Sequence, residues 1–291
     1  MNKLLVALIV CAPLASQAPA PLTFDVASMK PSPSPPGPPT FNFPLGPGDA
    51  YTPNGGYFNA TNVPLSAYIG FAYKLVGNQS QSLLDQLPGW VREERFDIQA
   101  RAQGNPTKDQ MRMMMRSLLA ERCKLALHEE TRQVSVAALV LVKPGRLGPQ
   151  LVPHPPDIPC PLDAPPSETT PDGRFPLLCG GLLQMSPGAP GHVRLGGRNV
   201  TMAFLANILS SRSDVGRAMV DRTGLDGKFD FNLEFQSTVL SAGKPGDELP
   251  LDASGPTFEQ ALKEQFGVKL ESQKSPVTVL VLDHIERPSG N

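Results

Sequence analysis

Residues 199–235 read NVTMAFLANILSSRSDVGRAMVDRTGLDGKFDFNLEF, and this stretch predicts a short helix, a turn-rich crossover and a strand. The same plan occurs earlier, where residues 62–75 read NVPLSAYIGFAYKL and lead through a crossover to RFDIQAR at 95–101. The echo continues downstream, because PTKDQ at 106–110 and PTFEQ at 256–260 both match the pattern of a helix capping box. One unit is therefore used twice, and this repeat organises the chain.

Each unit predicts the element order β-α-β-β-α-β-β. The fold class expected is therefore α+β, with two tandem βαββαββ modules, small mixed sheets and helices packed on them. Residues 125–130 and 134–142 are expected to close the first module as two strands. Residues 269–273 and 277–285 are expected to close the second module in the same way.

An Asp follows a Phe at matching places of the two units, as Phe96-Asp97 and Phe229-Asp230. A functional reading must explain why both units carry this pair. A structural role explains it more simply, with the Phe buried and the Asp capping or pairing with a nearby basic group.

The composition excludes several function classes. The chain has 291 residues, 40% of them apolar, which is enough to bury one or two cores. Its 26 basic and 27 acidic residues give a net charge of −1, so no global field favours nucleic acid or anionic lipid. Aromatic residues make up 6% with a single Trp, which argues against a stacking platform for bases or sugars.

The first residues predict export. A short positive start is followed by an apolar run at 4–14 and small residues at 15–20, the order of a secretory signal peptide over residues 1–20. The run is too short to span a bilayer. Lipid modification of Cys11 is an alternative that the sequence leaves open. No other segment is long and apolar enough to span, so we expect an exported chain, periplasmic or extracellular.

Proline-rich segments divide the mature chain. The first α+β module is expected at 21–143, with a Pro-rich insertion at 31–54. A Pro-rich connection follows at 144–192, and the second α+β module occupies 193–291.

Three cysteines remain once the signal is removed. Cys160 and Cys179 bracket a structure-poor stretch, where a short-loop disulfide would stabilise the fold by about 3 kcal/mol. Metal ligation is the alternative, but two Cys without a nearby His pair make a poor zinc site. Cys123 lies on the apolar face of a predicted helix, which indicates a buried and inert thiol.

Six segments of the chain match a known family: FDVASMKPS at 24–32, GGYFNATNVPL at 55–65, LPGWVREERFDIQARA at 87–102, PTKDQMRMMMRSLLAERCKLALHEETR at 106–132, VDRTGLDGKFDFNLEF at 220–235 and VLVLDHIERPS at 279–289. Together they closely resemble a soil-associated family of secreted bacterial proteins of unknown function. Cys123 departs from that family's usual aromatic residue at this helix position. The family is similar to extracellular tails on some membrane-bound antirepressor-type metallopeptidases. More distantly, residues 199–235 resemble the short N-terminal domain of secretins and TonB-dependent receptors, which implies protein contacts in the envelope.

A search for catalytic motifs is negative. The chain has no HExxH, GxSxG, phosphate loop or GxGxxG segment. His128 and His284 stand beside carboxylates on predicted strands, where neighbouring side chains face opposite ways. We interpret both as exposed strand residues, although folding could bring the two together as a metal-binding pair. His154 and His192 lie in predicted loops with no partner in the nearby sequence.

The spacing of Asp221, Asp226 and Asp230 around two glycines does not match a calcium loop, and turn chemistry accounts for it. We therefore expect no catalytic, cofactor-binding or metal-binding residues and no cofactor.

Two functions remain. The first is an exported, non-catalytic protein-interaction module whose partner is another envelope protein, bound through an exposed sheet edge or helix face. The second is a small-ligand-binding protein or an enzyme with its site in the cleft between the modules. A pocket with convergent polar groups would favour the second function, and a long unpaired strand edge with an apolar rim would favour the first.

Overall fold

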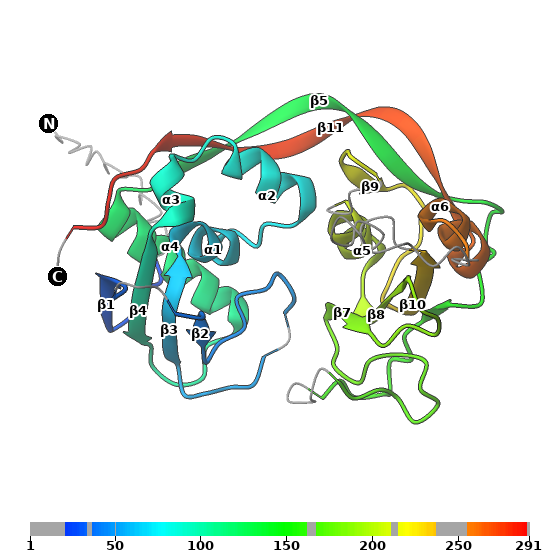
Figure 1. Cartoon of the computed structure of the whole chain (residues 1–291), viewed down its shortest axis with the longest axis horizontal. Coiled ribbons are helices and arrows are strands. Elements are labelled where there is room, and N and C mark those ends of the chain that lie inside the picture. Colours follow the sequence, from blue (N-terminus) through cyan, green and yellow to red (C-terminus); the bar gives the residue numbers. More distant parts are fainter. Residues whose placement is uncertain are drawn as a thin grey trace, which may run out of the picture.

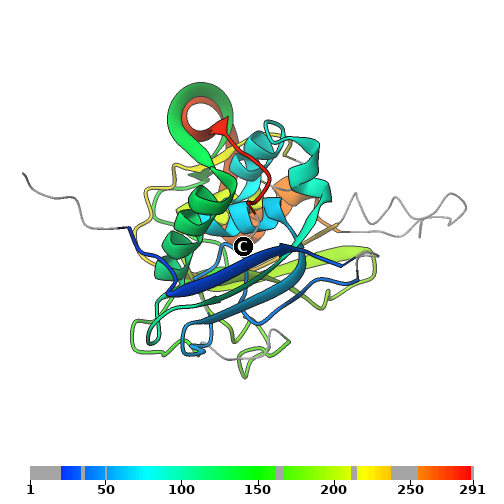
Figure 2. The ribbon, with the colours of Figure 1, turned by 90° about the vertical axis from the view of Figure 1, so that its left-hand side faces the viewer.

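The computed structural model describes residues 21–33, 37–49, 51–161, 167–210, 215–236 and 255–289. These residues form two lobes, each with a four-stranded sheet and packed helices, and a long ribbon of two strands bridges the lobes (Figure 1). Viewed from the side of the first lobe, the helices lie between the sheet and the ribbon (Figure 2). The predicted α+β class is confirmed. The signal-peptide prediction for residues 1–20, Cys11 included, lies outside the described residues.

The first lobe contains an antiparallel sheet of strand order β1-β4-β3-β2. Its main helix, α4, begins after Thr107, whose capping box with Gln110 is formed as predicted. One face of α4 packs into the lobe's core, because Met111, Met115 and Leu119 are fully buried there. The elements are β1 (Val26–Pro31), β2 (Thr40–Phe41), β3 (Tyr57–Pro64), α1 (Leu65–Ala72), α2 (Gly77–Leu84), α3 (Gly89–Glu93), β4 (Arg95–Arg101) and α4 (Lys108–Cys123).

The second lobe contains an antiparallel sheet of strand order β6-β10-β8-β7, which repeats the order of the first sheet. The capping box of Thr257 with Gln260 is again formed, but the helix is short and its second half is a π-helical turn, η1. The elements are β6 (Leu151–Pro153), β7 (Gly181–Met185), β8 (His192–Val200), α5 (Met202–Leu209), β10 (Phe229–Gln236), α6 (Phe258–Ala261) and η1 (Leu262–Phe266).

The bridging ribbon corrects the prediction for the closing strands. Instead of two short strands per module, β5 (Ala126–Leu141) and β11 (Val268–His284) are single long strands that pair antiparallel with each other. The first half of β5 and the last half of β11 cover the first lobe, and the other halves cover the second lobe. Strand β9 (Met219–Asp221) joins β5 in parallel. Self-contained tandem modules are therefore not confirmed, since each lobe is closed by strands from both halves of the chain.

The predicted connection at 144–192 also contributes to the second sheet. Strands β6 and β7 lie within it, and both are sheet edges. Pro153 ends β6, where a residue without an N–H is tolerated. Three- and five-residue edge strands among prolines leave too short a pattern for periodicity to detect. Within the described ranges, no helix has both the length and the apolar character needed to cross a membrane.

The repeated Asn and Asp residues form the same β-bulge in both sheets. In the first sheet, Asn62 has a φ of 58° and its backbone N–H donates to Asp97 Oδ1 at 2.8 Å. In the second sheet, Asn199 has a φ of 55° and its N–H donates to Asp230 Oδ1, also at 2.8 Å. Asn tolerates this left-handed conformation better than most residues. The structural role predicted for the two Asp residues therefore agrees with their geometry.

Candidate functional site

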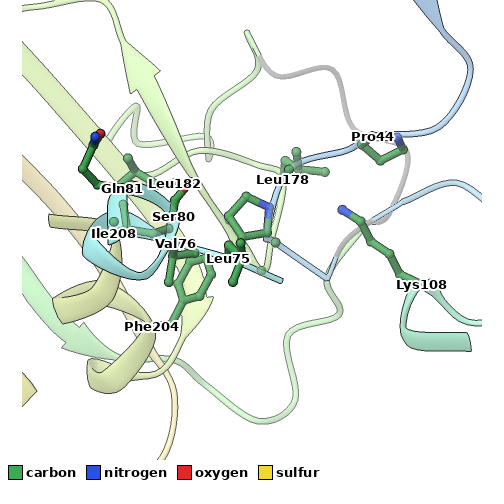
Figure 3. Close-up of a pocket in the computed structure, with 16 residues that line it drawn as sticks. Pro44, Leu75, Val76, Ser80, Gln81, Lys108, Leu178, Leu182, Phe204 and Ile208 are labelled. Atoms are coloured by element: carbon green, nitrogen blue, oxygen red, sulfur yellow. The ribbon is translucent and has the colours of Figure 1, made fainter. Parts of the chain in front are cut away.

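A cavity with a volume of about 560 Å³ lies where the two lobes face each other. The first lobe contributes the loop at 44–48, the segment at 75–81 with the start of α2, and Lys108 at the start of α4. The second lobe contributes the segment at 178–182 and the outer face of α5. The side chains that reach into the cavity are mostly apolar: Pro44, Leu75, Val76, Leu178, Leu182, Phe204 and Ile208 (Figure 3).

Two glycines bring the lobes into contact at this cleft. A Cβ on Gly48 would lie 2.6 Å from the carbonyl oxygen of Gly180, and the Asp49 N–H donates to that same oxygen at 3.2 Å. Gly77 has a φ of 50° at the start of α2, and a Cβ there would collide with Ser210. The lobes therefore approach each other more closely than any side chain would allow at these two points.

A buried arginine anchors the loop that lines the cleft. Arg112 on α4 is 2% exposed, and its guanidinium donates to the carbonyl oxygens of Pro47 at 2.9 Å and Gly48 at 2.8 Å. The same group forms an ion pair with Asp49 at 2.9 Å. Lys74 and Arg112 together hold the pKa of the Asp49 carboxyl below its usual value, against the opposing effect of burial. This network fixes one wall of the cleft to α4.

Lys108 is the charged side chain that faces the cleft. It is the first residue of α4, it is 4% exposed, and it extends toward the space between Pro44 and Leu178 (Figure 3). Within the described part of the chain, its ammonium forms no hydrogen bond or ion pair. Burial, and secondly the charge of Arg112, lower the pKa of Lys108 to about 8. The partial positive charge of the helix N-terminus acts in the same direction.

This arrangement suits an amphipathic anion. Apolar walls would take up a hydrocarbon group, and an unpaired ammonium at the edge would take up a carboxylate or a similar group. Ser80 and Gln81 are the other polar side chains among the described lining residues. Sequence reasoning missed Lys108, because a lysine in the first turn of a helix normally lies in solvent.

The predicted disulfide is confirmed, since Cys160 and Cys179 are bonded with their Cα atoms 5.5 Å apart. Cys179 is followed directly by residues that line the cleft. Cys123 is a buried free thiol, as predicted, and burial raises its pKa to about 12.

Two histidines lie on the exposed end of the ribbon. His128 contacts Asp283 at 2.8 Å and His284 contacts Glu286 at 2.8 Å, and all four side chains are largely exposed. The structure places both histidines near one end of the ribbon, over the first lobe, each with its own carboxylate. Among the described residues, no group of three His, Cys, Asp or Glu side chains is arranged to hold a metal ion.

The other two histidines have partners that the sequence did not reveal. His154 Nδ1 lies 2.7 Å from Asp230 Oδ1, with both side chains buried, and His192 Nδ1 lies 3.3 Å from Glu234 Oε1. The expectation that these histidines have no partner holds only for the nearby sequence, because the carboxylates are 76 and 42 residues away. The repeated Asp was the signal that could have directed attention to His154.

The turn after β9 has the chemistry predicted for it. Asp221 Oδ1 accepts hydrogen bonds from the Thr223 backbone N–H at 2.9 Å and from the Thr223 hydroxyl at 2.7 Å. This Asp therefore stabilises a turn.

A comparison with protein families matched residues 66–285 to the family DUF3738, described as a protein of unknown function. No curated protein and no solved structure matched the chain. Because the match extends over most of its length, from α1 to the end of β11, the chain belongs to this family.

Proposed function

We propose that this member of a family without a known function is an exported, non-catalytic binding protein whose cleft takes a small amphipathic anion. A medium-chain carboxylate is the chemistry that fits best. The observation that carries the proposal is Lys108, a residue only 4% exposed whose ammonium has no hydrogen-bond or ion-pair partner among the described residues and lies beside an apolar cavity. A buried cation without a counter-charge lowers the stability of a fold. A ligand carboxylate would supply the missing partner.

The cavity also supports a ligand with a substantial apolar part. Its volume of about 560 Å³ lies in the range of small-molecule sites. Such sites are lined mainly by apolar side chains and contain a few polar groups that orient the ligand. Here the apolar lining comes from both lobes, so the ligand would contact both.

Binding is favoured over catalysis by the surroundings of Lys108. A lysine whose pKa is lowered by burial also occurs as a nucleophile in enzymes. Proton transfer, however, requires a second positioned acid or base. The described lining places only a serine and an amide near the cavity besides Lys108. Export is supported by the disulfide, which is typical of oxidising compartments, and by the signal-peptide pattern at 1–20.

The test is a calorimetric titration with three probes that share a chain and differ in head group: dodecanoate, 1-dodecanol and dodecylamine. Dodecanoate should bind the wild type best, and dodecylamine worst. Lys108→Met should weaken dodecanoate binding about 10- to 100-fold, the loss of a hydrogen bond to a charged group. It should leave dodecanol binding unchanged. Lys263→Met is the matched control, since Lys263 is exposed on η1. Equal affinity of dodecanoate for the wild type and Lys108→Met would contradict the proposal.

The affinity should also depend on pH. A bound carboxylate favours the protonated form of Lys108, so the pKa of Lys108 would be higher in the complex than the value of about 8 in the free protein. Dodecanoate affinity should be flat between about pH 6, where its carboxyl group is still ionised, and pH 8, and fall as the pH rises further. The charged groups nearest Lys108 are Asp49, Lys74, Asp109 and Arg112. The fall should disappear in Lys108→Met, because these neighbours remain and only the amine is gone.

Interaction with another envelope protein is the second candidate. It draws on the likeness to the N-terminal domain of secretins and on the position of β11 at the edge of its sheet. Part of that edge is already covered, however, because two glutamine side chains bond to its backbone groups. Gln86 bonds to the backbone of Leu280 at 3.1 Å and of Leu282 at 3.1 Å, and Gln79 bonds to Thr278 at 3.3 Å. Such covering of an edge opposes strand addition. A crosslinking pull-down that captures one envelope protein, with dodecanoate not bound, would favour this candidate.

A further inference from the structure

The Cys160–Cys179 disulfide lies against a buried His–Asp pair. His154 Nε2 is 3.7 Å from Cys160 Sγ, and His154 Nδ1 is 2.7 Å from Asp230 Oδ1. The side-chain amide of Asn199 donates a hydrogen bond to Cys160 Sγ at 3.0 Å. The His154 and Asp230 side chains are 6% and 7% exposed. One sulfur of the cross-link is therefore contacted by two polar side chains, and a third, Asp230, holds the imidazole.

The fold places these groups through the β-bulge of the second sheet. The left-handed backbone of Asn199 directs its N–H to Asp230. His154 follows directly after Pro153, the end of β6, which pairs with Phe229 beside Asp230. Arg198 is the further charged neighbour, with its Nε 3.8 Å from Asp230 Oδ2. The imidazole is thus held by β10 on one side and touches the sulfur on the other.

The two cysteines differ in exposure. Cys179 is buried with 2% exposure, whereas Cys160 is partly exposed. An incoming thiol would therefore reach Cys160 first. This asymmetry, together with a histidine at the accessible sulfur, is the environment in which a cysteine thiolate is stabilised and reactive.

We propose that Cys160–Cys179 is a thiol–disulfide exchange site in addition to a cross-link. Its reaction partner is a small thiol or a dithiol protein. Cys160 is the sulfur that exchanges, Cys179 is the internal partner, and His154 is the proton acceptor. Asp230 positions His154, and Asn199 holds the released sulfur.

Reduction proceeds in two balanced steps. His154 Nε2 takes the proton of an incoming thiol, and the resulting thiolate attacks Cys160 Sγ. A mixed disulfide forms with Cys160, the Cys160–Cys179 bond breaks, and Cys179 leaves as a thiolate. A second thiol, as its thiolate, attacks the sulfur of the first thiol and displaces the Cys160 thiolate, while its proton passes to Cys179. Two electrons move from the thiols to the protein disulfide.

The released Cys160 thiolate is then paired with protonated His154 and with the Asn199 amide. Charge-assisted hydrogen bonds of this kind are stronger than neutral ones. Stabilising the reduced form makes a disulfide easier to reduce. The disulfide should therefore open under milder conditions than one without these neighbours.

The test is equilibration of the native protein in glutathione buffers of graded ratio, followed by alkylation and peptide mass analysis. Cys123 is the internal control, because its buried thiol should stay unmodified in the native protein. The midpoint is the value of [GSH]²/[GSSG] at which half of the protein molecules have the disulfide reduced. This midpoint should be about tenfold higher for His154→Gln than for the wild type. His192→Gln is the matched control, since His192 also pairs with a carboxylate but touches neither sulfur. It should leave the midpoint unchanged.

Equal midpoints for the wild type and His154→Gln would overturn the proposal. So would a wild-type disulfide that opens only together with loss of the near-ultraviolet circular dichroism signal. If His154→Gln does not fold, Asn199→Gly decides instead. Glycine keeps the left-handed backbone and removes only the amide that donates to Cys160. A midpoint displaced in the same direction as expected for His154→Gln supports the proposal, and an unmoved midpoint refutes it.

Discussion

The β-bulges of the two lobes share a backbone and differ in one side chain. In the first lobe, Asp97 Oδ1 accepts from the Asn62 N–H and from the Ser32 hydroxyl at 2.6 Å. In the second lobe, Asp230 Oδ1 accepts from the Asn199 N–H and bonds to the imidazole of His154. Ser32 and His154 occupy equivalent positions, because each follows the proline that ends the neighbouring edge strand.

A second pair of equivalent positions differs in the same manner. Lys108 and Phe258 each follow the capping Thr of their helix, and each is 4% exposed. Phe258 packs on Phe235 in the core of the second lobe, whereas Lys108 faces the cleft. The lobes therefore agree where residues support the fold. They differ where a titratable or charged side chain has replaced a neutral one, and those positions are where we place function.

Breaking the two bulges should give the largest effect. Asp230→Ala should lower the free energy of unfolding by about 3–5 kcal/mol, because buried Arg198 and the backbone N–H lose their partner. Asp97→Ala removes hydrogen bonds from neutral donors, so about 1–3 kcal/mol is expected. Urea unfolding of the oxidised proteins measures both. Equal losses of unfolding free energy in the two variants would contradict the stabilising role given to the charged neighbours of Asp230.

The contact between the lobes should be nearly as sensitive. Gly77→Ala should cost about 2–4 kcal/mol, the sum of a steric clash with Ser210 and an unfavourable positive φ. Gly46→Ala, in the loop at 44–48 of the same lobe, is the control, because a Cβ there has open space around it. Thermal unfolding of both variants tests this. A Gly77→Ala variant as stable as Gly46→Ala would show that the lobes do not meet at α2 as described.

Replacing Lys108 by an apolar residue should have a smaller effect of the opposite sign. Lys108→Met should raise the free energy of unfolding at pH 7 by about 0.5–2 kcal/mol, since it removes a buried unpaired charge. The pKa of Lys108 is lowered to about 8 in the folded state, so its destabilising effect is complete below pH 8 and disappears toward pH 10.5. Urea titrations from pH 7 to pH 10.5 should show the two proteins converging. If Lys108→Met were less stable than the wild type at pH 7, the conclusion that the Lys108 amine has no partner would be contradicted.

Much of the fold could be predicted from short-range patterns. Capping boxes and apolar helix faces depend on neighbours within a few positions, and the structure has them. The Asn and Asp of each bulge are 35 and 31 residues apart, but their repetition in both units pointed to a shared structural role. The disulfide followed from the compartment and the spacing of Cys160 and Cys179.

The bridging ribbon could not be predicted in this way. Its middle section contains mostly polar residues, at 129–133 in β5 and 271–275 in β11, and that pattern resembles a break between two strands. The two candidate sites have the same limitation. Lys108 lines a cavity together with the loop at 44–48 and the second lobe, and His154 meets Asp230 from 76 residues away. Contacts between distant segments leave no periodic trace in a single sequence.

The most direct test of ligand binding in the cleft is a crystal structure of the protein with 12-bromododecanoate, located by the anomalous signal of bromine. The carboxylate should lie about 2.7–3.2 Å from Lys108 Nζ. The chain should run along Leu75 and Phe204, between the two lobes. A carboxylate bound away from Lys108, or a cleft that stays empty at saturating ligand, would contradict the account.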